Sequence, residues 1–146
     1  MIYLDTSFIA PLFRAEALST AVEACLARQA VGTLAVSHWT RLEFSGVMAR
    51  DVRMGVIEPR DALLALDAFD AFAEDSLHVF SPAAADYRLA DLFVRNFATH
   101  LRAADALHLA IARNQGIDEI FTLDEGLLGA ARRLKIKAGK KIRTSP

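Results

Sequence analysis

Short apolar segments alternate with longer segments of helical periodicity along this chain, and that alternation limits the folds it can adopt. Four short segments are rich in strand-forming residues and bounded by turn signals, as buried strands are: residues 1–5, 34–36, 77–80 and 119–123. Between them, apolar side chains recur every three or four residues, as in helices. This alternation predicts an α/β fold of three layers, with a central, mainly parallel sheet of four or five strands and helices on both faces.

The helices are expected over six segments: residues 17–30, 38–54, from 59, from 82, 102–116 and 125–134. Ser37 is placed to cap the second of these helices. Ile142 is assigned to a fifth strand at the edge of the sheet.

A length of 146 residues, with 53% hydrophobic and 24% charged residues, predicts one globular domain over residues 1–146. No apolar stretch approaches the roughly 18 to 20 residues that a membrane span needs, so no membrane partner is expected. Asp5 interrupts the first apolar segment and no basic region precedes it, which argues against a signal peptide. Cys25 is the single cysteine and cannot form an internal disulfide, so a cytoplasmic location is expected.

The net charge of -1 conceals an uneven distribution of charge along the chain. All 18 acidic residues lie at or before Glu125, whereas seven of the 17 bases lie in residues 132–143. The other ten bases leave residues 1–131 with a net charge of -8. A basic tail over about 132–146 can attract phosphate backbones, or it can be a solvated terminus that aids solubility. The candidate phosphate contacts are Arg132, Arg133 and Lys135.

Two acidic residues follow predicted strands, where the ligands of parallel sheets gather. Asp5 ends the first strand and Asp124 ends the fourth. Because the carboxyl ends of parallel strands meet at one edge of the sheet, both carboxylates are expected there. The alternative for each is that it caps the helix that follows.

Two further acids lie on or beside the apolar faces of predicted helices. Glu43 is flanked by Trp39 and Val47 one turn away, and Asp105 stands among alanines in the first turn of its helix. A buried carboxylate without a partner costs several kcal/mol, so each needs an explanation. Glu43 could pair with Arg50 or Arg41, and Asp105 could interact with the helix dipole. Arg102 could neutralise Asp105 or bind a substrate phosphate.

If these four acids converge, their mutual repulsion calls for a cation between them. A set of oxygen donors without paired histidines or cysteines suits Mg²⁺, or Mn²⁺, better than zinc. The chemistry expected of such a site is hydrolysis of a phosphoester by a metal-activated water. His108 follows Asp105 by three residues and could approach the acidic site, but a packed or interfacial role is expected for it.

The same four acids lie in motifs that resemble those of PIN-domain ribonucleases. Asp5 lies in Tyr-Leu-Asp-Thr-Ser, Glu43 in Arg-Leu-Glu-Phe, Asp105 in Ala-Ala-Asp-Ala-Leu-His-Leu-Ala and Asp124 in Phe-Thr-Leu-Asp. The motifs follow the family's order and spacing over residues 2 to about 140. More narrowly, the chain resembles the VapC-like toxins of bacterial toxin–antitoxin pairs.

The resemblance implies a PIN-like fold and endonucleolytic cleavage of RNA that depends on Mg²⁺ or Mn²⁺. It also implies a homodimer and a small VapB-like antitoxin whose C-terminal segment covers the acidic pocket. Three hydroxyl residues match positions that orient the carboxylates or a water: Thr6, Ser7 and Thr122. We expect Asp5 and Asp105 to bind the metal directly, Asp124 to bind it through water, and Glu43 to bind it or orient the attacking water.

Two other functions compete with that of a ribonuclease toxin. One is a catalytically silent RNA-binding or regulatory module on the same fold, against which the presence of all four acids speaks. The other is a small Mg²⁺-dependent phosphatase that forms a phosphoaspartate. Such an enzyme needs a second aspartate two residues after the nucleophile, but Ser7 stands two residues after Asp5.

Overall fold

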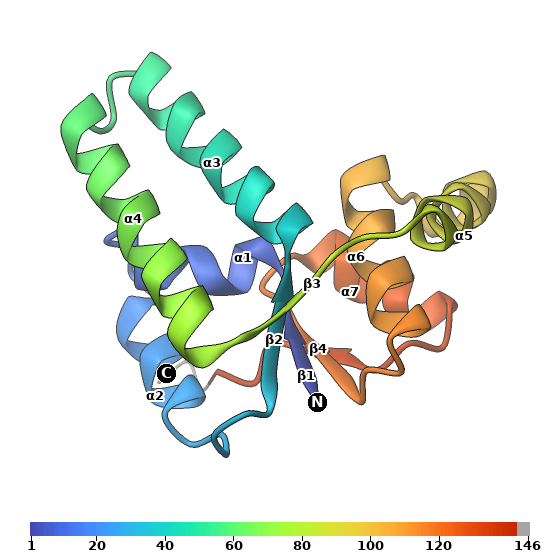
Figure 1. The fold of residues 1–146 in the computed structure, drawn as a ribbon. Helices are drawn as coiled ribbons and strands as arrows, with labels where there is room; N and C mark the ends of the chain where they lie inside the picture. Colours follow the sequence, from blue (N-terminus) through green and yellow to red (C-terminus); the bar gives the residue numbers. More distant parts are fainter. Residues whose placement is uncertain (143–146) are drawn as a thin grey trace.

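Five parallel strands form the centre of the protein, whose structure, a computed structural model, describes residues 1–142 (Figure 1). The strands are β1 (Ile2–Leu4), β2 (Leu34–Ser37), β3 (His78–Phe80), β4 (Glu119–Phe121) and β5 (Ala138–Gly139). Their order across the sheet is β3-β2-β1-β4-β5, and every neighbouring pair is parallel. The predicted parallel α/β fold is therefore confirmed. Arg143, the last base of the predicted basic tail, lies outside the described residues.

The helices connect consecutive strands and cover both faces of the sheet (Figure 1). The α-helices are α1 (Thr6–Ile9), α2 (Ser19–Leu26), α3 (His38–Arg53), α4 (Pro59–Ser76), α5 (Ala84–Arg95), α6 (Ala103–Asn114) and α7 (Glu125–Arg133). Two 3₁₀ turns, η1 (Ala10–Leu12) and η2 (Phe97–Thr99), lie between them. Over residues 1–142, no helix is both long enough and apolar enough to cross a bilayer.

Successive side chains of the strands pack alternately into two apolar cores, one on each face of the sheet. Leu4 and Phe121 belong to the core beneath α1 to α4, whereas Tyr3 and Ile120 belong to the core beneath α5 to α7. Because successive side chains of a strand point to opposite faces, a sheet covered on both sides reads as a continuous apolar run. This is why β1 and the last two residues of β4, Ile120 and Phe121, are apolar.

Two elements differ from the sequence-based prediction. The helix predicted over 17–30 covers only Ser19–Leu26, because the backbone then tightens into turns that lead to Gly32, whose φ is +77°. The fifth strand lies at Ala138–Gly139 rather than around Ile142. Lys141 adopts a left-handed φ of 53°, which ends the extended backbone, and Ile142 packs on the apolar core instead.

Three polar side chains cap helices where strands end. Ser37 caps α3 as predicted, and its hydroxyl accepts a hydrogen bond from the backbone N–H of Thr40. Asp5 caps α1 and Asp124 caps α7. These caps bring the start of each helix, and both aspartates, to the carboxyl edge of the sheet.

Candidate active site

A cavity of about 650 Å³ at the carboxyl edge of the sheet is lined by all four predicted acids. Asp5 reaches it from the end of β1, Glu43 from α3, Asp105 from the first turn of α6 and Asp124 from the start of α7. The four elements are far apart in sequence, so the fold itself brings the four carboxylates to one cavity.

Asp5 is the most buried of these acids, at 3% exposure. Its Oδ1 accepts hydrogen bonds from the backbone N–H of Phe8 at 3.1 Å and from the Ser7 hydroxyl at 2.9 Å. Its Oδ2 accepts from the Thr122 hydroxyl at 2.9 Å. Burial raises the pKa of Asp5 to about 6, although these hydrogen bonds act to lower it. Asp5 therefore caps its helix and also belongs to the cavity.

The hydroxyls of Ser7 and Thr122 fix Asp5 against the end of β4. The two hydroxyl oxygens lie 3.2 Å apart. Ser7 accepts the backbone N–H of Leu123 at 2.9 Å, and Thr122 accepts that of Asp124 at 3.0 Å. Since both hydroxyls accept from the backbone and donate to Asp5, they hold its carboxylate in one orientation.

Glu43 has neither of the partners considered for it from the sequence. Its Oε2 instead accepts from the Thr6 hydroxyl and lies at hydrogen-bond distance from His108 Nε2. Burial acts to raise the pKa of Glu43, but the hydrogen bonds from His108 and Thr6 outweigh it, so the pKa is lowered. The two arginines considered as its partners are turned elsewhere, Arg41 to Asp70 and Arg50 toward Asp51.

His108 lines the cavity although the sequence favoured a packed or interfacial role for it. It is packed, as expected, at 1% exposure. Its Nδ1 lies 2.8 Å from the hydroxyl of Tyr3, whose pKa is raised by burial. The available signal was the spacing from Asp105, because residues three apart share one face of a helix.

Asp105 and Asp124 both lie near the guanidinium of Arg102. Arg102 Nε is 3.5 Å from Asp105 Oδ2, and Arg102 Nη2 is 3.8 Å from Asp124 Oδ2. The other oxygen of Asp124 caps α7 through Leu127 N at 2.8 Å. Burial, followed by the charge of Asp124, raises the pKa of Asp105. Arg102 itself is largely exposed and lines the cavity, so it can neutralise the acids or contact an anion.

Two further arginines, neither of them predicted as a site residue, line the same cavity. Arg14 and Arg50 both approach the buried Asp51, with Arg14 Nε 2.7 Å and Arg50 Nη2 3.4 Å from its oxygens. Arg14 also pairs with Glu16 at 2.9 Å. Since two carboxylates already occupy Arg14, Arg50, with a half-exposed side chain, is the better placed of the two to meet a ligand.

The predicted basic residues of the tail do not line this cavity. Arg132 and Arg133 lie in the last turn of α7, about 12 Å along the helix from Asp124. Lys135 follows that helix in a left-handed conformation. Further along, the ion pairs of the tail are local: Lys137 and Lys141 with Glu119, and Lys140 with Glu125.

The donor set of the cavity suits a hard divalent cation, although the ligands are not fully gathered. Over residues 1–142, no three histidine, cysteine or acidic side chains lie close enough to enclose a metal ion as they stand. Mg²⁺ is commonly held by one or two carboxylates, while waters and substrate phosphates complete its shell. Burial raises the pKa of Asp5 and, together with the charge of Asp124, that of Asp105, and a bound cation would favour the ionised form of both carboxylates. The residues present therefore fit Mg²⁺ or Mn²⁺.

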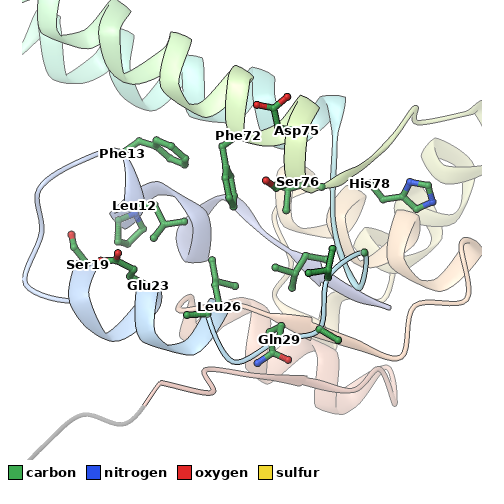
Figure 2. A pocket seen from close by; sticks show the side chains of 17 residues that line it. Leu12, Phe13, Ser19, Glu23, Leu26, Gln29, Phe72, Asp75, Ser76 and His78 are labelled. Carbon is green, nitrogen blue, oxygen red and sulfur yellow. The ribbon is translucent and has the colours of Figure 1, made fainter.

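A second cavity, of about 830 Å³, lies between η1 with the adjoining Phe13, α2 and the end of α4 (Figure 2). Leu12, Leu26 and Phe72 line it, and no predicted site residue does. Pro11 lines this cavity and the preceding Ala10 lines the acidic one, so the two cavities flank the same turn.

The family model of the PIN domain matches residues 2–133, which is most of the chain. The chain belongs to the PIN-domain family. The resemblance noted in the sequence is thereby confirmed at the level of the family. No curated protein sequence matches this PIN domain significantly.

Solved structures of toxins and toxin–antitoxin complexes share this PIN fold. Mycobacterium tuberculosis VapC20, a sarcin-ricin loop cleaving toxin, is 21% identical with a TM-score of 0.65, covering 89% of this chain and 95% of its own. FitAcB from Neisseria gonorrhoeae is 19% identical with a TM-score of 0.67, covering 97% and 98%. VapBC-1 from nontypeable Haemophilus influenzae is 14% identical with a TM-score of 0.67, covering 97% and 98%. At these identities the likeness concerns the fold.

Proposed function

We propose that this PIN domain is a metal-dependent endoribonuclease and the toxin of a toxin–antitoxin pair. The observation that carries the proposal is the convergence of four carboxylates in one cavity, with arginines at its rim. Burial raises the pKa of Asp5 and Asp105, as expected where a cation is to be bound. The neighbouring VapC and VapBC structures support the toxin class.

The residues of the cavity divide the work as follows. Asp5 and Asp105 would hold the metal directly, and Asp124 would hold it through water, since its Oδ1 is occupied in capping α7. When bound, Mg²⁺ or Mn²⁺ would polarise the phosphate and supply a nucleophilic water. Glu43, whose pKa is lowered by its hydrogen bonds from His108 and Thr6, would orient that water. Attack at phosphorus would break the bond to the 3′ oxygen, leaving a 5′ phosphate and a 3′ hydroxyl.

End-group analysis of cleaved RNA tests this reaction. Purified protein is incubated with labelled single-stranded RNA and Mn²⁺, and a parallel sample contains EDTA. Products with 5′ phosphates that form only with the metal support the proposal. Binding without cleavage would favour the silent RNA-binding alternative, and a trapped phosphoenzyme would favour the phosphatase.

Arg50→Gln is expected to raise KM for RNA about tenfold while changing kcat little, because Arg50 would contact a flanking phosphate rather than the reacting atoms. The slope of log affinity against log salt should also fall by about one. Arg53→Gln is the matched control, because it removes the same charge from an exposed residue of α3 outside the cavity. Equal effects of the two variants on KM would contradict a role for Arg50 in the cavity. Arg102→Gln tests the corresponding contact on the other rim.

The partners proposed for the toxin are an antitoxin and a second copy of the chain. An antitoxin segment lying across η1 and Phe13 would place apolar side chains in the cavity of Figure 2 and cover the acids beside it.

The surface proposed for the second copy lies elsewhere. Leu92 and Phe97 are 62% and 82% exposed, and we propose that they belong to the homodimer contact. Copurification with the product of an adjacent small gene tests the first proposal, and the molar mass in solution tests the second. A cytoplasmic location accords with an RNA substrate.

A further inference from the structure

A chain of hydrogen bonds runs from the N-terminal cap of α3 through the core to the acidic cavity. Tyr3 and His108, at 0% and 1% exposure, form its middle. The Tyr3 hydroxyl lies 2.7 Å from Ser37 Oγ and 2.8 Å from His108 Nδ1. At its other end, His108 Nε2 reaches Glu43 Oε2. The chain thus links three elements that the sequence keeps apart: β1, α3 and α6.

The Tyr3 hydroxyl also lies 3.2 Å from Thr40 Oγ1, but its contacts with Ser37 and His108 are shorter and give the chain of hydrogen bonds its direction. Ser37 Oγ accepts the backbone N–H of Thr40 at 3.3 Å, which leaves its own proton available for the Tyr3 oxygen. A tyrosine hydroxyl keeps its proton at neutral pH, so Tyr3 can donate to His108 Nδ1. A neutral imidazole that accepts at Nδ1 carries its proton on Nε2. His108 then donates to the Glu43 carboxylate.

Both donors to Glu43 act on the same oxygen. The Thr6 hydroxyl and His108 Nε2 both engage Oε2, and over residues 1–142 no hydrogen bond engages Oε1. One carboxylate oxygen is therefore tied to the protein, and the other is left for the cavity. Without His108, Glu43 would be held by the Thr6 hydroxyl alone and could turn toward an arginine of the rim.

We propose that His108, held by Tyr3 in the tautomer protonated at Nε2, is the positioning residue for Glu43. It fixes one oxygen of Glu43 and thereby aims the other at the reacting water. Its contribution to cleavage rests on the proposed function, whereas the tautomer and the hydrogen bond do not. Neither His108 nor Tyr3 is proposed to contact the RNA.

Two amide substitutions of His108 distinguish the role of Nδ1 from that of Nε2. The amide of His108→Gln can place a donor where Nε2 lies, whereas the shorter His108→Asn can replace only Nδ1. We expect His108→Asn to lower kcat about 10- to 100-fold with little change in KM, and His108→Gln to recover most of that loss. In a Glu43→Gln background, His108→Asn should cause no further loss, because it acts through Glu43.

Equal losses in the two amide variants, or a full further loss in the Glu43→Gln background, would overturn the proposal. Thermal unfolding of each variant shows whether a loss merely reflects destabilisation. An equal fall in activity and in folded fraction would also count against a positioning role.

Nitrogen-15 NMR of the imidazole tests the tautomer without any cleavage assay. In the metal-free protein, His108 should show a protonated Nε2 and an unprotonated Nδ1, and Tyr3→Phe should weaken that preference. Protonation of both nitrogens, or of Nδ1 alone, would overturn the proposed arrangement. Because this readout does not depend on RNA, it distinguishes failure of the inference from failure of the proposed function.

Discussion

Asp5→Asn is expected to reduce metal-dependent RNA cleavage by about 10³-fold or more, while the fold is retained. The substitution removes a charged oxygen from the proposed metal site, and electrostatic stabilisation of the reacting phosphate depends on that metal. The amide keeps the size of the side chain and can still accept the cap hydrogen bond from Phe8 N. Single-turnover cleavage of labelled RNA at saturating Mn²⁺ measures the effect.

Asp61→Asn provides the matched control. This substitution makes the same chemical change at Asp61, an exposed residue in the first turn of α4 that lies outside the cavity. We expect it to cleave RNA at the wild-type rate, and Asp105→Asn to fail as Asp5→Asn does. Undiminished cleavage by folded Asp5→Asn protein would refute the assignment of Asp5 to the reacting centre.

The second large effect is on stability in the absence of metal. Burial raises the pKa of Asp5 from 3.8 to about 6, so the native state holds this proton more tightly than the unfolded chain does. The stability that this proton contributes is present below about pH 4 and is lost as the pH rises through about 6. At pH 7 the loss amounts to about 3 kcal/mol, from about 1.4 kcal/mol for each unit of pKa. Asp105, with a raised pKa, adds an effect of the same sign.

Urea unfolding of the wild type and of Asp5→Asn, from about pH 4 to pH 8 in EDTA, isolates this contribution. Between those limits the difference in unfolding free energy should move by about 2.5 kcal/mol in favour of Asp5→Asn. Mn²⁺ should restore stability to the wild type at neutral pH and do less for the variant, because the metal binds the ionised carboxylate. A constant difference across this range would show that Asp5 is not electrostatically strained.

The sheet and its edge could be predicted because they depend on local patterns. A parallel strand buried on both faces is a short apolar run, and the residue after it lies at the carboxyl edge. Position alone therefore places Asp5 and Asp124 at the edge of the sheet where the acidic cavity lies. The four-residue α1 is too short to show periodicity, and the left-handed backbone at Lys141, which displaces the fifth strand, leaves no mark in the sequence.

The hydrogen-bond and ion-pair partners of the charged side chains in the cavity could not be predicted, because they depend on contacts between residues far apart in the sequence. Glu43 has arginines nearby on its own helix, yet it is bound by His108, which lies 65 residues away. Arg14 and Arg50 meet at Asp51, which gives no sign in the sequence of being buried. The distribution of charge along the sequence instead predicted phosphate contacts in the basic tail. The helical part of that tail lies at the far end of α7. The acids were identifiable by type and position, but the groups that orient them were not.

The position of Mn²⁺ in crystals of the protein, located by its anomalous scattering, tests the central claim most directly. We expect a peak in the acidic cavity, bonded to the carboxylates of Asp5 and Asp105, and its loss in Asp5→Asn crystals. Cleavage of RNA with Mn²⁺ by a protein that shows no peak in this cavity would contradict the metal site proposed for these carboxylates.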